Sequence, residues 1–216
     1  MDMKVIAILI CSWLLCCGAA SAQEGSVQHI PKLEINKKKH KVFSGRDSSI
    51  TLIIDTLVMK NRAKLVFYGK KKVNLKVKYA DIEKDAFILG TDGKNNGSDM
   101  DITMRFAKLG SLWVSAAGDN AMNGSKTYPN GNGGDIVFKY LKDGVIPQQD
   151  NKRQTAYLTI ETKAGGYAVN AQSDIRNILD RIGKGNRPLR QLPQGQVYSG
   201  SPGMDGKSEV RAVTEF

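Results

Sequence analysis

Residues 50–79 read ITLIIDTLVMKNRAKLVFYGKKKVNLKVKY and contain short runs in which apolar side chains alternate with polar ones. A period of two residues indicates β-strands with one face toward a core and the other toward water. In the last of these runs we expect Val73, Leu75, Val77 and Tyr79 to point inward. The same alternation recurs later in the chain, at Ile102, Met104 and Phe106, at Ile136, Phe138 and Tyr140, and at Leu158 and Ile160. The pattern predicts an all-β protein.

Loops rich in glycine, asparagine and aspartate separate the later strands, at residues 90–97, 118–134 and 200–206. The order strand, glycine-rich loop, strand occurs three times, which indicates a degenerate repeat. Loops of such unequal length suit the rungs of a solenoid better than they suit tight hairpins. We therefore predict a short-strand β-solenoid resembling a single-stranded β-helix, with an antiparallel β-sandwich as the alternative.

A single helix is predicted near the C-terminus, at about residues 173–182. Ser173 can cap its start and Gly183 can end it. One helical face is formed by Ile175, Ile178, Leu179 and Ile182. Such a helix is expected to cover an edge or an end of the sheet, because an uncovered edge invites aggregation.

The first 22 residues have the features of a cleavable signal peptide: Lys4, an apolar run from Val5 to Leu15, and the small residues Ala20-Ser21-Ala22. The apolar run is too short to span a bilayer, so no transmembrane span is predicted in the mature protein. We expect export to the periplasm, the cell surface or the medium. Lipid attachment at Cys16 or Cys17 is the second interpretation of this segment.

The mature chain is predicted to have two parts: a polar, basic N-terminal arm at residues 23–47 and a single β-rich domain at residues 48–216. All three cysteines, Cys11, Cys16 and Cys17, lie in the predicted signal peptide. Disulfides and thiolate metal sites are therefore excluded from the mature chain. Its length is enough to bury a core without such links.

The formal net charge of +11 favours anionic partners such as acidic glycans and other envelope polymers. The alternative is that the charge only keeps an exported protein soluble. Lysines are dense around the first strands, and if these strands stack as rungs, their outward side chains would form one positive face. The candidate binding residues on it are Lys64, Lys70, Lys71, Lys72, Lys76 and Lys78. Aromatic residues are too sparse among them to predict specific nucleic-acid binding.

Trp113 lies between Leu112 and Val114, so alternation directs it away from the core. An outward tryptophan often marks a contact surface, and Tyr128 in the long glycine-rich loop could join it in binding a glycan. The alternative is that Trp113 packs beneath the loop of residues 118–134.

Catalytic and metal motifs are weak. The two histidines, His29 and His40, fall in the predicted arm, where a general base would not be oriented by a packed site. A loose calcium candidate is formed by Asp92, Asn95, Asn96, Asp99 and Asp101. Its spacing is not that of an EF-hand, and turn formation is the competing explanation. No cofactor and no metal site is predicted.

The chain also resembles glycine-rich exported proteins of unknown function from Bacteroidota. The resemblance rests on Asp55-Thr56-Leu57-Val58-Met59, on the loop from Gly90 to Gly97, on Gly131-Asn132-Gly133-Gly134 and on the loop from Gly200 to Gly206. It implies a location and a class but no activity.

Together these features predict a non-enzymatic, exported bacterial protein with a structural, adhesive or envelope-associated binding role, whose partner is an anionic polysaccharide. A carbohydrate-active enzyme resembling a polysaccharide lyase is the alternative. The sequence does not specify the oligomeric state.

Overall fold

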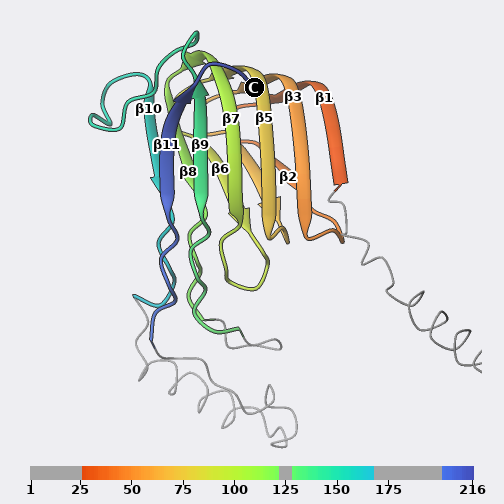
Figure 1. Cartoon of the computed structure of the whole chain (residues 1–216), viewed down its shortest axis with the longest axis vertical. Helices are drawn as coiled ribbons and strands as arrows, with labels where there is room; N and C mark the ends of the chain where they lie inside the picture. Colours follow the sequence, from red (N-terminus) through yellow and green to blue (C-terminus); the bar gives the residue numbers. More distant parts are fainter. Residues whose placement is uncertain (1–25, 122–127, 168–200) are drawn as a thin grey trace, which may run out of the picture.

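The computed structural model describes residues 26–121, 128–167 and 201–216. Strands alternate between two parallel sheets, sheet A with the order β1-β3-β5-β7-β9-β11 and sheet B with the order β10-β8-β6-β4-β2 (Figure 1). The strands are β1 (Ser26–Ile35), β2 (His40–Phe43), β3 (Ser49–Met59), β4 (Lys64–Tyr68), β5 (Lys72–Ile82), β6 (Ala86–Thr91), β7 (Asp99–Leu109), β8 (Ser111–Ser115), β9 (Ile136–Leu141), β10 (Tyr157–Glu161) and β11 (Ser208–Val213).

Each coil of the chain contributes one strand to sheet A and the next strand to sheet B, so the protein is a β-solenoid. Ser26, Ile50 and Val73 occupy the same position in successive coils, as do Met100 and Ile136 further on. Every pair of neighbouring strands in these sheets is parallel. The solenoid prediction is confirmed, and the antiparallel sandwich is excluded.

The long strands of sheet A bend at a corner, where two consecutive residues face outward. In β5, Val77 and Ala80 are buried while Lys78 and Tyr79 between them are exposed. The pairing register between β5 and β7 shifts at the same place. The inward position predicted for Tyr79 is therefore wrong, because strict alternation ends at the bend.

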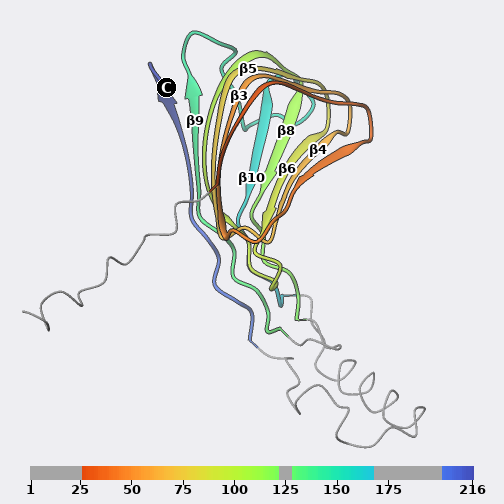
Figure 2. The ribbon, with the colours of Figure 1, turned by 90° about the vertical axis from the view of Figure 1, so that its right-hand side faces the viewer.

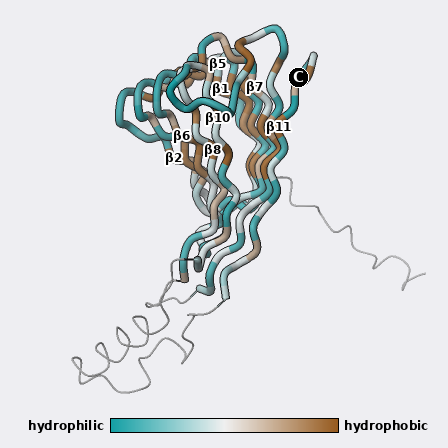
Figure 3. Tube along the Cα trace, turned by 90° about the vertical axis from the view of Figure 1, so that its left-hand side faces the viewer, coloured by the Kyte–Doolittle hydropathy of each residue, from teal (hydrophilic) through white to brown (hydrophobic). Residues whose placement is uncertain are grey.

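Figure 2 shows the two sheets facing each other, and Figure 3 shows hydrophobic residues recurring on neighbouring strands. Their apolar side chains form one buried cluster in the interior. Phe43 stacks on Phe67 with ring centroids 5.7 Å apart, and Phe106 stacks on Phe138 at 6.0 Å. The largest fully buried side chains also include Leu52, Ile54, Leu57, Met59, Leu65, Leu75, Ile82, Ile88 and Ile102. Five of these positions follow from the alternation of apolar and polar residues in the sequence: Leu52, Ile54, Leu65, Leu75 and Ile102.

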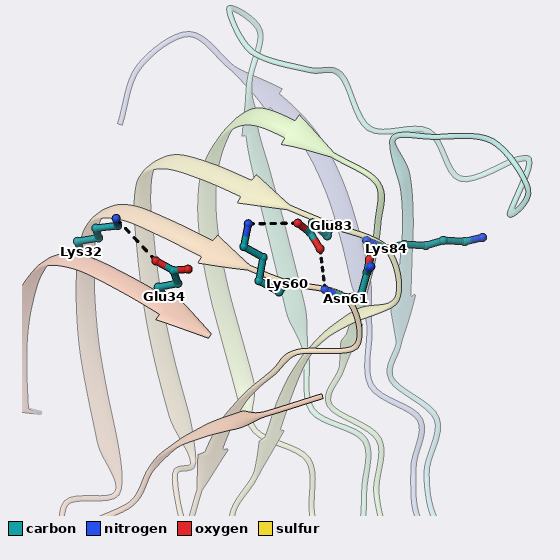
Figure 4. Close-up of polar contacts among 6 residues, drawn as sticks. All are labelled: Lys32, Glu34, Lys60, Asn61, Glu83 and Lys84. Carbon is teal, nitrogen blue, oxygen red and sulfur yellow. Dashed lines mark hydrogen bonds and ion pairs between the residues drawn. The ribbon is translucent and has the colours of Figure 1, made fainter. Parts of the chain in front are cut away.

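The turns from sheet A to sheet B repeat the same geometry in the first coils. Lys38, Arg62 and Asp85 occupy equivalent turn positions and have φ angles of 59°, 59° and 58°. The turns are also tied together by polar groups (Figure 4). The amide of Asn61 donates to Glu83 at 3.0 Å, and the amide of Lys84 donates to Oδ1 of Asn61 at 3.1 Å.

The N-terminal coil of the solenoid is built from the predicted basic arm. Strands β1 and β2 pair with β3 and β4 along their length, and Ile35 and Phe43 are buried in the core. The predicted boundary between an N-terminal arm and the β-rich domain at residues 47 and 48 is therefore wrong. The many lysines of this segment hide the alternating pattern of its strands. The helix predicted at about residues 173–182 and the signal peptide of residues 1–22 lie outside the described residues.

The glycine-rich loops connect strands of sheet B to the next strands of sheet A and run side by side beyond the ends of the sheets (Figure 2). Their backbones bond directly to one another: the amide of Gly131 donates to Asp119, that of Gly165 to Gly131, and that of Gly203 to Gly165. A Cβ atom at Gly131 would overlap the carbonyl oxygen of Asn95. Glycine is required there because main chains pack against each other without side chains between them.

Candidate functional site

The outer face of sheet B carries a column of side chains that crosses the strands. Lys64 of β4, Phe87 of β6, Trp113 of β8 and Thr159 of β10 are in register, one from each successive coil. The neighbours of Trp113 in its strand, including Leu112, are buried, whereas Trp113 is only partly buried. The prediction that Trp113 faces away from the core is therefore confirmed.

A cavity of about 380 Å³ lies over this column. Its volume is in the range typical of small-molecule sites. The lining includes the aromatic side chains Phe87, Trp113 and Tyr157, together with Lys64 and Lys152. Lys152 comes from the connection between β9 and β10, so the site combines a flat sheet surface with a side chain from a loop.

The two aromatic rings on the floor of the cavity form a stacked pair. The ring centroids of Phe87 and Trp113 are 6.1 Å apart, with an angle of 29° between the planes. The indole Nε1 of Trp113 donates to Oε2 of Glu161 at 3.2 Å, and the hydroxyl of Ser115 lies 3.5 Å from the same oxygen. These contacts fix the orientation of the indole ring, so the apolar surface is prearranged.

Two ammonium groups lie over this aromatic pair. Nζ of Lys64 is 5.5 Å from the ring centroid of Phe87, and Nζ of Lys152 is 6.0 Å from the ring of Trp113. Neither lysine forms an ion pair with a carboxylate within the part of the chain that the structure describes. Each ammonium group instead contacts the electron-rich face of a ring, an interaction worth about 0.5–1 kcal/mol at an exposed site.

The remaining charged groups of the lining belong to the turn between the sheets. Arg62 and Asp85 approach each other to 3.9 Å, and the amide of Asp85 donates to the hydroxyl of Ser111 at 2.7 Å. The lining therefore has three basic side chains, those of Arg62, Lys64 and Lys152, and one carboxylate. Positive charge predominates in the cavity.

On sheet A, by contrast, several basic side chains are neutralised by carboxylates of an adjacent coil. Lys78 lies 2.7 Å from Asp55, and this hydrogen bond, followed by that of His29, lowers the pKa of Asp55. Lys139 lies 2.7 Å from Asp101. These pairs join neighbouring coils and leave less positive charge for a ligand.

The ion pair of Lys60 and Glu83 joins the corners of two coils (Figure 4). Nζ of Lys60 lies 3.2 Å from Oε1 of Glu83, and this hydrogen bond raises the pKa of Lys60. The backbone amide of Asn61 and the Lys60 ammonium lower the pKa of Glu83. The pair has a structural role in linking the coils.

The predicted lysines do not share one face. Lys64 lies on sheet B, whereas Lys72, Lys76 and Lys78 belong to β5 of sheet A. Lys70 is only 2% exposed and Lys71 is exposed beside it at the corner. The prediction that these lysines form a single polyanion-binding face is therefore wrong. The chain turns from sheet B to sheet A between Lys64 and Lys72, so their side chains lie on different faces.

Tyr128 does not line the cavity. It lies in the glycine-rich loops, where the side-chain amide of Asn95 lies 3.5 Å from its carbonyl oxygen. Tyr128 therefore does not join Trp113 in lining this cavity. Sequence reasoning missed Phe87, Lys152 and Tyr157. The similar spacing was the available signal for Phe87, since Lys64, Phe87 and Trp113 are separated by 23 and 26 residues, about one coil each.

The carboxylates of the calcium candidate are engaged in other contacts. Oδ1 of Asp92 accepts hydrogen bonds from the amides of Lys94 and Asn96, at 2.7 and 3.1 Å. Oδ1 of Asp99 accepts one from the amide of Asp135, and Asp101 pairs with Lys139. These contacts support the alternative explanation, that Asp92 stabilises a turn. Across residues 26–121, 128–167 and 201–216, no group of three or more histidine, cysteine or acidic side chains could hold a metal ion.

Comparison with protein-family models, with curated proteins and with solved structures found no match for this chain. The described residues include no helix with the length and apolar character of a membrane span. The fold defines the protein as an all-β solenoid.

Proposed function

We propose that the protein is an exported, non-enzymatic binding protein that holds an anionic polysaccharide in the cavity on sheet B. The observation that carries this proposal is the stacked pair of Phe87 and Trp113 with Lys64 and Lys152 above it, free of carboxylate partners within the described residues. Sugar rings present apolar C–H faces that pack on aromatic rings. The acidic groups of such a sugar would bond the ammonium groups, and bonds between charged partners are stronger than neutral ones.

Export would bring the cavity into contact with the acidic polymers of an envelope or an extracellular matrix. The signal-peptide pattern of residues 1–22 and the net charge of +11 support this location. Mass spectrometry of the secreted protein should find a mature N-terminus at Gln23. A product that keeps residues 1–22 and stays in the cytoplasm would contradict this part of the proposal.

The binding function is tested by affinity chromatography on immobilised polygalacturonate, with immobilised dextran as the neutral comparison. The wild-type protein should be retained on the acidic resin alone. The double variant Lys64→Gln and Lys152→Gln should lose this retention. The matched control, Lys71→Gln and Lys76→Gln, removes the same charge at residues that do not line the cavity and should still be retained. Equal loss in both variants would show that net charge alone is responsible and would reject the site.

A polysaccharide lyase is the second candidate, favoured by the basic and acidic side chains of Arg62, Lys64 and Asp85 in one cavity. A base would remove the proton at C5 of a uronate, the C4–O bond would break, and a proton would pass to the leaving oxygen. The unsaturated product absorbs in the ultraviolet. This product should appear when a lyase is incubated with polygalacturonate, and it should not form with the Lys64→Gln variant. Both results together would favour the lyase over the binding protein.

A further inference from the structure

The outer face of sheet B offers a bound polymer two directions. One direction runs across the strands along the column of Lys64, Phe87 and Trp113. The other runs along β4, from Lys64 past Val66 to Tyr68, whose side chain is 54% exposed. Both directions start at Lys64 and contain an aromatic side chain. They differ in how many aromatic rings and ammonium groups a polymer would meet along them.

On the basis of the proposed function, we infer that the acidic sugar chain lies across the strands, parallel to the solenoid axis, with one sugar against the side chain of Phe87 and the next against that of Trp113. Neighbouring strands in a sheet are about 4.8 Å apart. Phe87 and Trp113 come from adjacent coils, and their ring centroids are 6.1 Å apart. This separation is close to the advance of one pyranose unit along a polysaccharide, which allows two successive sugars to bind these two coils.

The charges repeat in the same direction. Lys64 lies over Phe87 and Lys152 lies over Trp113, so each aromatic ring has its own ammonium group. A chain with one carboxylate per sugar would place one acidic group near each lysine. The ammonium groups would leave the ring faces for the carboxylates, because a charge-assisted hydrogen bond is stronger than an exposed cation–π contact. The site therefore fits two consecutive uronates better than a single one.

The two ends of the column differ. At the β10 end, the connection between β9 and β10 folds against the strand: the amide of Gln148 donates to Ala156, and that of Leu158 donates to Gln148, both at 2.8 Å. At the other end the column continues from Lys64 to the exposed side chain of His40 in β2. The chain should therefore be limited at β10 and be able to extend beyond Lys64 toward β2.

Isothermal titration of the full chain with galacturonate monomer, dimer, trimer and tetramer tests the number of sugar positions. The dimer should bind at least about tenfold more tightly than the monomer, and the tetramer should add little to the trimer. If polygalacturonate binds but the dimer is no tighter than the monomer, the two-sugar arrangement is overturned while the binding function stands. If neither the polymer nor any oligomer binds, the binding function itself fails.

Three alanine variants test the direction. Phe87→Ala and Trp113→Ala should each weaken dimer binding about tenfold, whereas Tyr68→Ala should change it less than about twofold. A loss in Tyr68→Ala with normal binding in Trp113→Ala would overturn the direction and place the sugars along β4. Unchanged circular dichroism of all three variants separates a lost contact from a lost fold. In a Trp13→Phe background, the fluorescence of the single remaining tryptophan, Trp113, should change on addition of the dimer.

Discussion

Nζ of Lys70 lies 2.6 Å from the backbone carbonyl oxygen of Asp47, and only 2% of the Lys70 residue is exposed. The carbonyl oxygen of Lys70 in turn accepts a hydrogen bond of 2.5 Å from the hydroxyl of Ser98. Lys70 thus joins the corners of three successive coils. A lysine that the sequence assigned to a binding surface is part of the interior.

Replacement of Lys70 should therefore destabilise the fold. Lys70→Met removes the donor for the Asp47 carbonyl and is expected to cost about 1–3 kcal/mol of unfolding free energy. Lys70→Glu puts a carboxylate beside that carbonyl and should cost more, about 3–5 kcal/mol. Urea denaturation measures both. The exposed neighbour supplies the control, since Lys71→Glu should stay within about 0.5 kcal/mol of wild type. Equal effects at the two positions would contradict the burial of Lys70.

Gly131 should not tolerate alanine. The added Cβ would overlap the carbonyl of Asn95 in a neighbouring segment, and neither main chain can move without breaking its hydrogen bonds. We expect a loss of more than about 3 kcal/mol, or release of the glycine-rich loops. Hydrogen exchange at the amides of Gly131 and Gly165 detects either result.

Gly69→Ala is the matched control for this glycine. Gly69 has a φ of +72°, but nothing lies within 4 Å of an added Cβ. Its replacement should cost only the left-handed backbone penalty of about 1–2 kcal/mol. If Gly131→Ala lost no more unfolding free energy than Gly69→Ala, the result would contradict the close main-chain packing of the loops.

The bend in sheet A predicts losses of stability of different size for two aromatic residues near it. Phe106 is 1% exposed and stacks on Phe138, so Phe106→Ala should cost about 3–5 kcal/mol. Tyr79 is 49% exposed and contacts Arg105 through a cation–π interaction at 5.0 Å, so Tyr79→Ala should cost about 1 kcal/mol or less. Thermal unfolding of the two variants compares them. A larger loss of stability in Tyr79→Ala than in Phe106→Ala would show that Tyr79 points inward, and it would contradict the bend.

The ion pairs between coils should make stability depend on pH in the acid range. Folding lowers the pKa of Glu83 below its ordinary value of 4.5 and that of Asp55 below its ordinary value of 3.8. Both carboxylates therefore stabilise the folded state at pH values above these unfolded values. That contribution is lost as the pH falls through the lower, folded pKa values.

The variant Glu83→Gln should accordingly lose part of the fall in melting temperature that the wild type shows below about pH 4.5. Melting temperatures measured between neutral and acid pH provide the comparison. The control Glu34→Gln removes a carboxylate that pairs with Lys32 of its own strand at 3.7 Å. This variant keeps the ion pair of Glu83, so its melting temperature should fall at acid pH as that of the wild type does. A Glu83→Gln curve parallel to that of the wild type throughout would show that this pair is not coupled to folding.

Most of the fold could be predicted from the sequence, because alternation is a local signal. The inward positions of β3, β4 and β7 follow from their own apolar residues, and so does the outward orientation of Trp113. Prediction failed where local patterns were interrupted. Tyr79 lies at a bend, and strand β1 is hidden among charged residues and Pro31.

The candidate site was less accessible to prediction. Trp113 and Lys64 were named for separate reasons, but nothing in either strand says that Phe87 lies between them. Their alignment depends on the length of each coil, which the backbone hydrogen bonds between strands fix at 23 and then 26 residues. Lys152 reaches the cavity from a connection with no strand pattern, so no local signal marks it.

By itself the sequence determined the all-β class, the alternation of core and surface and the positions of the glycine-rich loops, because each of these follows from side-chain size and polarity over a few residues. The tertiary structure alone decided which lysines line the cavity on sheet B, which one is buried and which aromatic rings meet. Those relationships join residues one coil or more apart, and they are set by strand register and by the bend of the sheet.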